Sequence, residues 1–201
     1  MLEKVSRIIS IVFNPILTPT LGFILLFLSG FYENMLTAEA KRFVLLVIFF
    51  STATLPMLTI AILSFNPKFD FLMKNSRDSI VPLLLTAIYY YIGFVLLGRI
   101  HFLSMFKLFM LGSVLLIICL LFISFKWKIS IHMAAIGAVT ATFFAISFRT
   151  GINPVSAVII LVIVSGLIGT SRLVLQKNSL LQVAAGYVLG FLILYPVIYF
   201  L

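Results

Sequence analysis

The sequence predicts an all-α integral membrane protein, a bundle of six to seven transmembrane helices that forms one domain over residues 1–201. Of the 201 residues, 63% are hydrophobic and only 9% are charged, whereas a soluble domain carries roughly 25% charged residues. The few charges divide the chain into apolar segments long enough to cross a bilayer. Lipid offers no hydrogen-bond partner to an open backbone, and no segment alternates as barrel strands do, so each segment is expected to be helical.

Seven segments contain no Asp, Glu, Lys or Arg: 8–32, 43–67, 79–98, 108–125, 129–148, 150–171 and 178–201. About 20 apolar residues, within a range of roughly 17–25, cross the hydrocarbon core. Asn14, Pro15 and Pro19 interrupt the first segment, so residues 1–15 are expected to lie along the membrane surface as an amphipathic helix. Pro56 is expected to kink the second crossing.

Small residues mark packed faces in the fifth and seventh segments. They recur at three- to four-residue spacing, as Ala134, Gly137, Ala138 and Ala141 in one segment and as Gly186 and Gly190 in the other. Such spacing lets two helix backbones approach closely in a membrane. We therefore expect both segments to lie in the interior of the bundle.

The formal net charge of +9 reflects 14 Lys and Arg residues, and these stand almost entirely between the apolar segments. That placement is typical of topogenic charge and of lipid-headgroup contact, so we expect membrane lipids as partners and no nucleic acid. With seven crossings, the N-terminus shares one side with the connections 65–80, 126–131 and 171–181, and that side holds nine cations. The positive-inside rule would place it in the cytoplasm, unless several of these cations form a binding site, so the orientation stays open.

Three polar groups fall on this side of the bundle: Lys74, Arg77 and Asp78; Lys128, Ser130 and His132; and Arg172, Lys177 and Asn178. Cationic and hydroxyl donors from three connections are suited to phosphate oxygens. The side has little carboxylate, and the single cysteine of the chain, Cys119, lies inside an apolar run. We therefore expect a phosphate pocket without a metal or a cofactor.

The order and spacing of these groups resemble the membrane branch of the type 2 phosphatidic acid phosphatase superfamily. That family reads K-x6-R-P, then P-S-G-H, then S-R-x5-H-x3-D. The counterparts here are Lys74 to Pro82, I-S-I-H at Ile129–His132, and S-R-L-V-L-Q-K-N at Ser171–Asn178 with Gln182 behind it. The stretches VPLLLT, KISIH and QVAAGYVLGF also resemble small phosphatase-like membrane proteins of Bacteroidetes, which implies a bacterial cytoplasmic membrane.

The resemblance implies hydrolysis of lipid phosphates or polyprenyl diphosphates at the membrane surface without a metal. A third-motif histidine attacks phosphorus, an aspartate orients it, and a second-motif histidine protonates the leaving oxygen. His132 fits this general acid. The implied phosphate-binding residues are Lys74, Arg77, Lys128, Ser130, Ser171 and Arg172, with Arg77 displaced from the motif arginine.

The chain departs from the family at the nucleophile, because Asn178 stands where the histidine is expected and Gln182 stands where the aspartate is expected. An amide nitrogen is not basic, so Asn178 cannot form a phosphoenzyme. The only other histidine, His101, falls on the opposite side. The sequence therefore favours a protein that binds a lipid or polyprenyl phosphate with hydrolysis lost or weakened.

Two other functions remain open for this chain. One is an active phosphatase with a rearranged site, and the other is a non-catalytic subunit of a larger membrane complex. A small transporter is disfavoured, because the sequence offers no acidic or broken-helix coupling site at the membrane midplane.

Overall fold

The computed structural model describes residues 2–30, 36–65, 80–98 and 104–201. The described residues form helices: α1 (Leu2–Val12), α2 (Thr18–Leu28), α3 (Ala38–Phe49), a π-helical turn η1 (Phe50–Thr54), α4 (Leu55–Ser64), α5 (Ile80–Gly98), α6 (Ser104–Ser124), α7 (Ile131–Thr150), α8 (Val155–Val174) and α9 (Leu180–Phe200). This confirms the all-helical prediction for the part of the chain that the structure describes.

Six of these helices are long and apolar enough to cross a membrane, if α3, η1 and α4 count as one continuous helix. The bundle is thus compatible with an integral membrane protein. The first predicted crossing differs from the others, since α2 has only 11 residues. At a rise of about 1.5 Å per residue, α2 covers roughly half of the hydrocarbon core.

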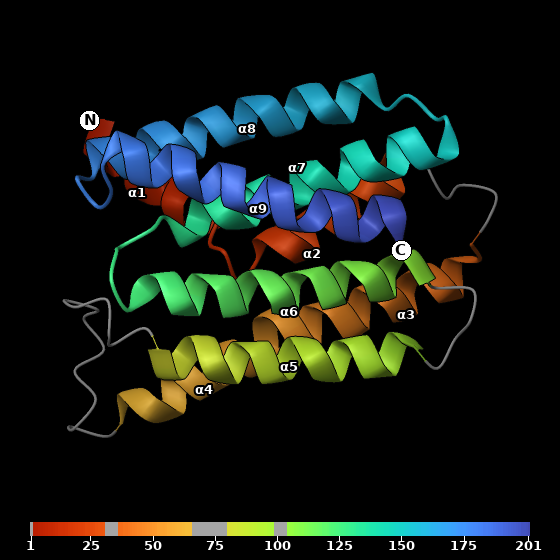
Figure 1. The fold of residues 1–201 in the computed structure, drawn as a ribbon, viewed down its shortest axis with the longest axis horizontal. Helices are drawn as coiled ribbons and strands as arrows, with labels where there is room; N and C mark the ends of the chain where they lie inside the picture. The colour runs from red at the N-terminus through yellow and green to blue at the C-terminus, as the bar shows by residue number, and fades with distance from the viewer. Residues whose placement is uncertain (1, 31–35, 66–79, 99–103) are drawn as a thin grey trace.

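The helices run side by side along the length of the bundle (Figure 1). The N-terminus and the connections 125–130 and 175–179 lie at one end, and the C-terminus and the connection 151–154 lie at the other. This arrangement follows the predicted sides. We call the first of these ends the cationic end, because its described cations are Lys4, Arg7, Lys126, Lys128, Arg172 and Lys177.

Helix α7 forms the centre of the bundle, and 67% of its membrane-length window is buried, against 28% for α9. The small residues bring these two helices into backbone contact. A Cβ atom at Gly186 would lie 2.5 Å from the carbonyl oxygen of Ser130, and one at Gly190 would collide with the carbonyl oxygen of Ala134. The predicted packing faces are confirmed, but α9 is not interior, because most of its residues are not buried although it packs against both α7 and α6.

The N-terminal region is broken into two helices, as the prolines predict. The backbone turns at Asn14, whose Oδ1 accepts a hydrogen bond from the N–H of Ile16 at 3.1 Å. Helix α1 then packs against α8 with Ser6 buried, while Ile8 and Ile11 are exposed on its outer face. Helix α1 thus turns Ser6 toward the protein, while its charged residues and much of its apolar surface stay exposed.

The second crossing contains a π-helical turn directly before Pro56. In this turn the N–H of Leu55 bonds to the carbonyl of Phe50, five residues earlier. A proline cannot complete the α-helical hydrogen bond four residues back, so the irregular register coincides with the defect that the sequence places here. Thr52 lies within this turn, and its side chain is fully buried.

Candidate functional site

The sharp connection between α8 and α9 positions the third-motif residues. Gln176 takes a left-handed conformation with φ of 52°, which reverses the chain. The hydroxyl of Ser179 accepts from the N–H of Gln182 at 3.4 Å, and Gln182 Oε1 accepts from the N–H of Ser179 at 3.0 Å. This capping box fixes the start of α9 and holds the Gln182 side chain over the connection.

Asn178 links this capping box to Arg172. Its Nδ2 donates to Gln182 Oε1 at 3.4 Å, and its Oδ1 accepts from Arg172 Nε at 3.0 Å. Because Gln182 Oε1 can only accept, it orients the Asn178 amide with the nitrogen toward itself. The oxygen is thereby left for the guanidinium. The pair at the nucleophile and orienter positions therefore holds an arginine in place.

The other motif residues reach the same region from the start of α7. His132 is the second residue of this helix. Its Nε2 lies 3.3 Å from the carbonyl oxygen of Ser10 and 3.4 Å from the Ser10 hydroxyl. A carbonyl oxygen can only accept, so the first contact requires the proton on Nε2. Arg172 Nη1 donates to the same Ser10 hydroxyl at 3.2 Å.

Ser10 was not among the predicted site residues, yet it joins His132 to Arg172. Sequence reasoning treated the N-terminal helix as a surface element. The signal that would have found it is the pair Ser6 and Ser10, which are spaced one turn apart on α1. These two serines face inward, so the hydroxyl and the carbonyl of Ser10 reach the two motif residues.

These residues open onto a cavity of about 470 Å³ within the bundle. Its outer end is lined by Lys128, His132, Arg172, Lys177 and Asn178. Its inner walls are mainly apolar and come from the α1–α2 break and from η1, α4, α5, α6 and α7, with Ile16, Leu116, Ile117 and Leu120 among them. None of the described lining residues is an aspartate or a glutamate, so none of them neutralises the positive charge of the three cations at the outer end.

Two predicted phosphate-binding serines lie away from this lining. Ser171 is buried and donates to the Leu167 carbonyl of its own helix at 2.6 Å. The hydroxyl of Ser130 is also buried, and it has no hydrogen-bond partner among the described residues. Lys74 and Arg77 lie outside the described residues, as does His101.

The interruption predicted in the first segment also contributes to the cavity. Asn14, Pro15, Ile16 and Pro19 line it, so the expected break in the first segment forms part of the cavity wall.

Fold and site together define a helical membrane protein in which an apolar cavity opens at a cationic end. No protein-family model, curated protein or solved structure matches the chain.

Proposed function

We propose that this chain is a phosphatase-like protein of the bacterial cytoplasmic membrane that binds a lipid or polyprenyl phosphate and does not hydrolyse it at a substantial rate. The supporting observation is the composition of the cavity, with three cations and no described carboxylate at one end and mainly apolar walls beyond. The oxygens of a phosphate group can accept hydrogen bonds from the guanidinium and ammonium donors. The hydrocarbon chain of a lipid or polyprenyl phosphate is suited to the apolar walls.

The surroundings of Asn178 also support binding without hydrolysis. Its amide oxygen is used by Arg172 Nε, and an amide has no basic nitrogen for attack on phosphorus. The nearby hydroxyl of Ser179 serves as the N-cap of α9. The site thus contains donors that would bind a phosphate, whereas the position of the nucleophile holds an amide that would not attack phosphorus.

We expect the purified protein in nanodiscs to bind phosphatidic acid and to release no phosphate from it above background. Phosphatidylglycerol phosphate and undecaprenyl diphosphate serve as further substrates in the same release assay. Robust release that His132→Ala abolishes would overturn the non-hydrolysing reading and favour an active, rearranged site. Binding of diacylglycerol as tight as that of phosphatidic acid would contradict a phosphate site.

We further expect Asn178→Ala to weaken phosphatidic acid binding by about tenfold, because a hydrogen bond to a charged group contributes about 1.5–3 kcal/mol. In this variant the Arg172 guanidinium loses the acceptor that fixes its orientation. Asn153→Ala, which changes an exposed amide at the opposite end of the bundle, is the matched control. Equal affinities of Asn178→Ala and the wild type, at equal thermal stability, would show that Arg172 does not depend on this contact.

A further inference from the structure

The cavity extends from the cationic end beyond the middle of the bundle. Its lining residues include Thr52, Tyr90 and Ala138, which lie near the middle of the spans Ala38–Ile62, Val81–Gly98 and Ile131–Thr150, respectively. On α6 the lining continues past the middle of the span Met105–Ser124 to Phe109.

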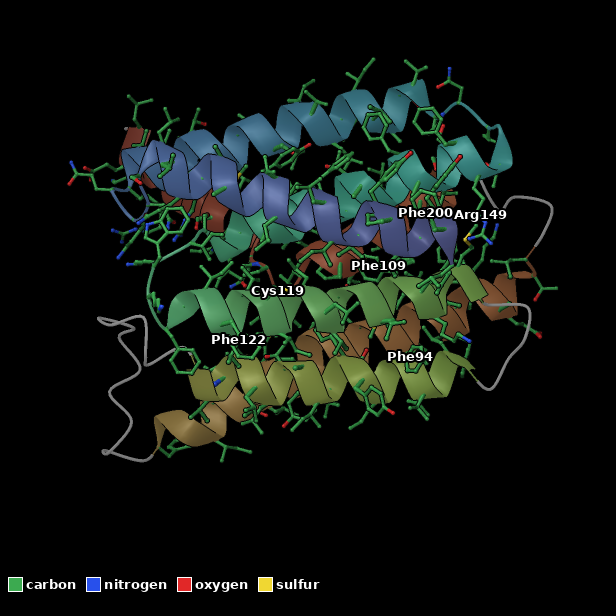
Figure 2. All side chains as sticks on the ribbon, viewed as in Figure 1. Phe94, Phe109, Cys119, Phe122, Arg149 and Phe200 are labelled. Atoms are coloured by element: carbon green, nitrogen blue, oxygen red, sulfur yellow. The ribbon has the colours of Figure 1, made fainter. Side chains whose placement is uncertain are left out.

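Phe109 of α6 forms the inner limit of the cavity. It is the lining residue of α6 farthest from the cationic end, and its side chain is buried. Its ring packs edge-on against Phe23 with centroids 4.7 Å apart, and Phe23 in turn packs against Phe106 at 5.6 Å. Figure 2 shows Phe109 between α6 and the helices above it, beyond the middle of α6 as counted from the cationic end. Within the described residues, aromatic packing therefore closes the cavity at its inner end.

The hydroxyl groups along the walls need few hydrogen bonds from a ligand. Thr86 donates to the Pro82 carbonyl at 2.7 Å, and Ser124 donates to the Leu120 carbonyl at 2.7 Å. Tyr90 forms a side-chain hydrogen bond with Thr52. Since these polar groups are satisfied within the protein, the surface that they leave to the cavity suits a hydrocarbon chain.

We infer that the cavity takes up one hydrocarbon chain of a phosphate-headed amphiphile, and that Phe109 determines the longest chain that fits. This inference rests on the proposed function. On α6 the lining runs from Ser124 to Phe109, a rise of about 22 Å at about 1.5 Å per residue, which leaves room for a long hydrocarbon chain. Acyl and prenyl chains share the chemistry that the walls recognise.

The test is a binding series of n-alkyl phosphates from hexyl to octadecyl, measured on the full chain in nanodiscs. Wild-type affinity, referred to the concentration of free alkyl phosphate in water, is expected to rise about fourfold per methylene, since transfer of each one from water to an apolar site contributes about 0.8 kcal/mol, and to stop rising once the chain reaches Phe109. Phe109→Ala should move this plateau to longer chains. Phe109→Leu should move the plateau by a smaller amount, and this variant takes the place of Phe109→Ala in the test if the alanine variant does not fold. Partitioning of the chain into the bilayer is the same for both proteins, so it cancels when the variant affinity is divided by the wild-type affinity at each chain length.

Two controls separate the inner limit of the cavity from a general effect on packing. Phe106→Ala removes a ring from the same aromatic cluster that does not line the cavity, and it should leave the plateau unchanged. Ala135→Leu narrows the cavity one turn from His132 and should move the plateau to shorter chains. A parallel series of prenyl phosphates shows which kind of chain has the Phe109-dependent plateau.

The outcomes distinguish this inference from the proposed function. An identical plateau in the wild type and both Phe109 variants, or no plateau in either series, would overturn the role of Phe109 while phosphate binding stands. Failure of every alkyl and prenyl phosphate to bind would overturn the proposed function itself.

Discussion

Replacing Arg172 by alanine is expected to weaken phosphatidic acid binding by at least about 100-fold while the bundle stays folded. Arg172 is the cation that the structure holds most firmly at the cavity, through Asn178 and Ser10. Each hydrogen bond from a charged donor contributes about 1.5–3 kcal/mol, and a guanidinium can give two of them to one phosphate. Titration of nanodiscs with phosphatidic acid, with diacylglycerol as the uncharged comparison, measures the effect.

Arg149→Ala is the matched control for this prediction. Arg149 stands in the last turn of α7, where its Nη1 donates to the Ile198 carbonyl at 2.8 Å, far from the cationic end (Figure 2). Its loss should leave lipid binding unchanged. Arg172→Lys keeps the charge without the planar fork, so it should bind with an intermediate affinity. If Arg172→Ala binds phosphatidic acid as the wild type does, Arg172 is not part of a phosphate site.

The second large effect is expected from Gly190→Leu, which should destabilise the bundle by about 3 kcal/mol or more. A Cβ atom at this position would collide with the carbonyl oxygen of Ala134 and approach the backbone nitrogen of Ala138 to 2.9 Å. Because the obstruction is backbone, α7 and α9 must separate to admit the side chain. The thermal midpoint should fall by on the order of 10 °C.

Gly166→Leu makes the same chemical change on α8, where a Cβ atom would meet nothing within 4 Å. This variant should melt close to the wild type, since surface substitutions usually stay within about 0.5 kcal/mol. Similar melting temperatures for the two leucine variants would contradict the close contact of α7 with α9. Both measurements need only purified protein in detergent.

Length and hydropathy were enough to predict the helices and the sides on which their connections lie. An apolar stretch bounded by charges has one stable form in lipid, because only a helix satisfies its own backbone. The small residues likewise predicted closely packed faces on α7 and α9, since close approach requires the absence of side chains at Gly186 and Gly190, and the structure showed that these two faces meet each other. The sequence alone therefore determined a helical membrane bundle with several cations at one end.

Only the tertiary structure decided how those cations are positioned and which side chains they contact. Ser10 lies 122 residues before His132 and 162 before Arg172, and no local pattern connects a polar face of α1 to these two side chains. The hydroxyl of Ser171, which the resemblance assigned to phosphate binding, donates to a carbonyl of its own helix. In the same way, the cavity and its limit at Phe109 depend on how five or more helices leave space between them. Packing of distant segments creates such a space, and the periodicity of any single segment carries no record of it.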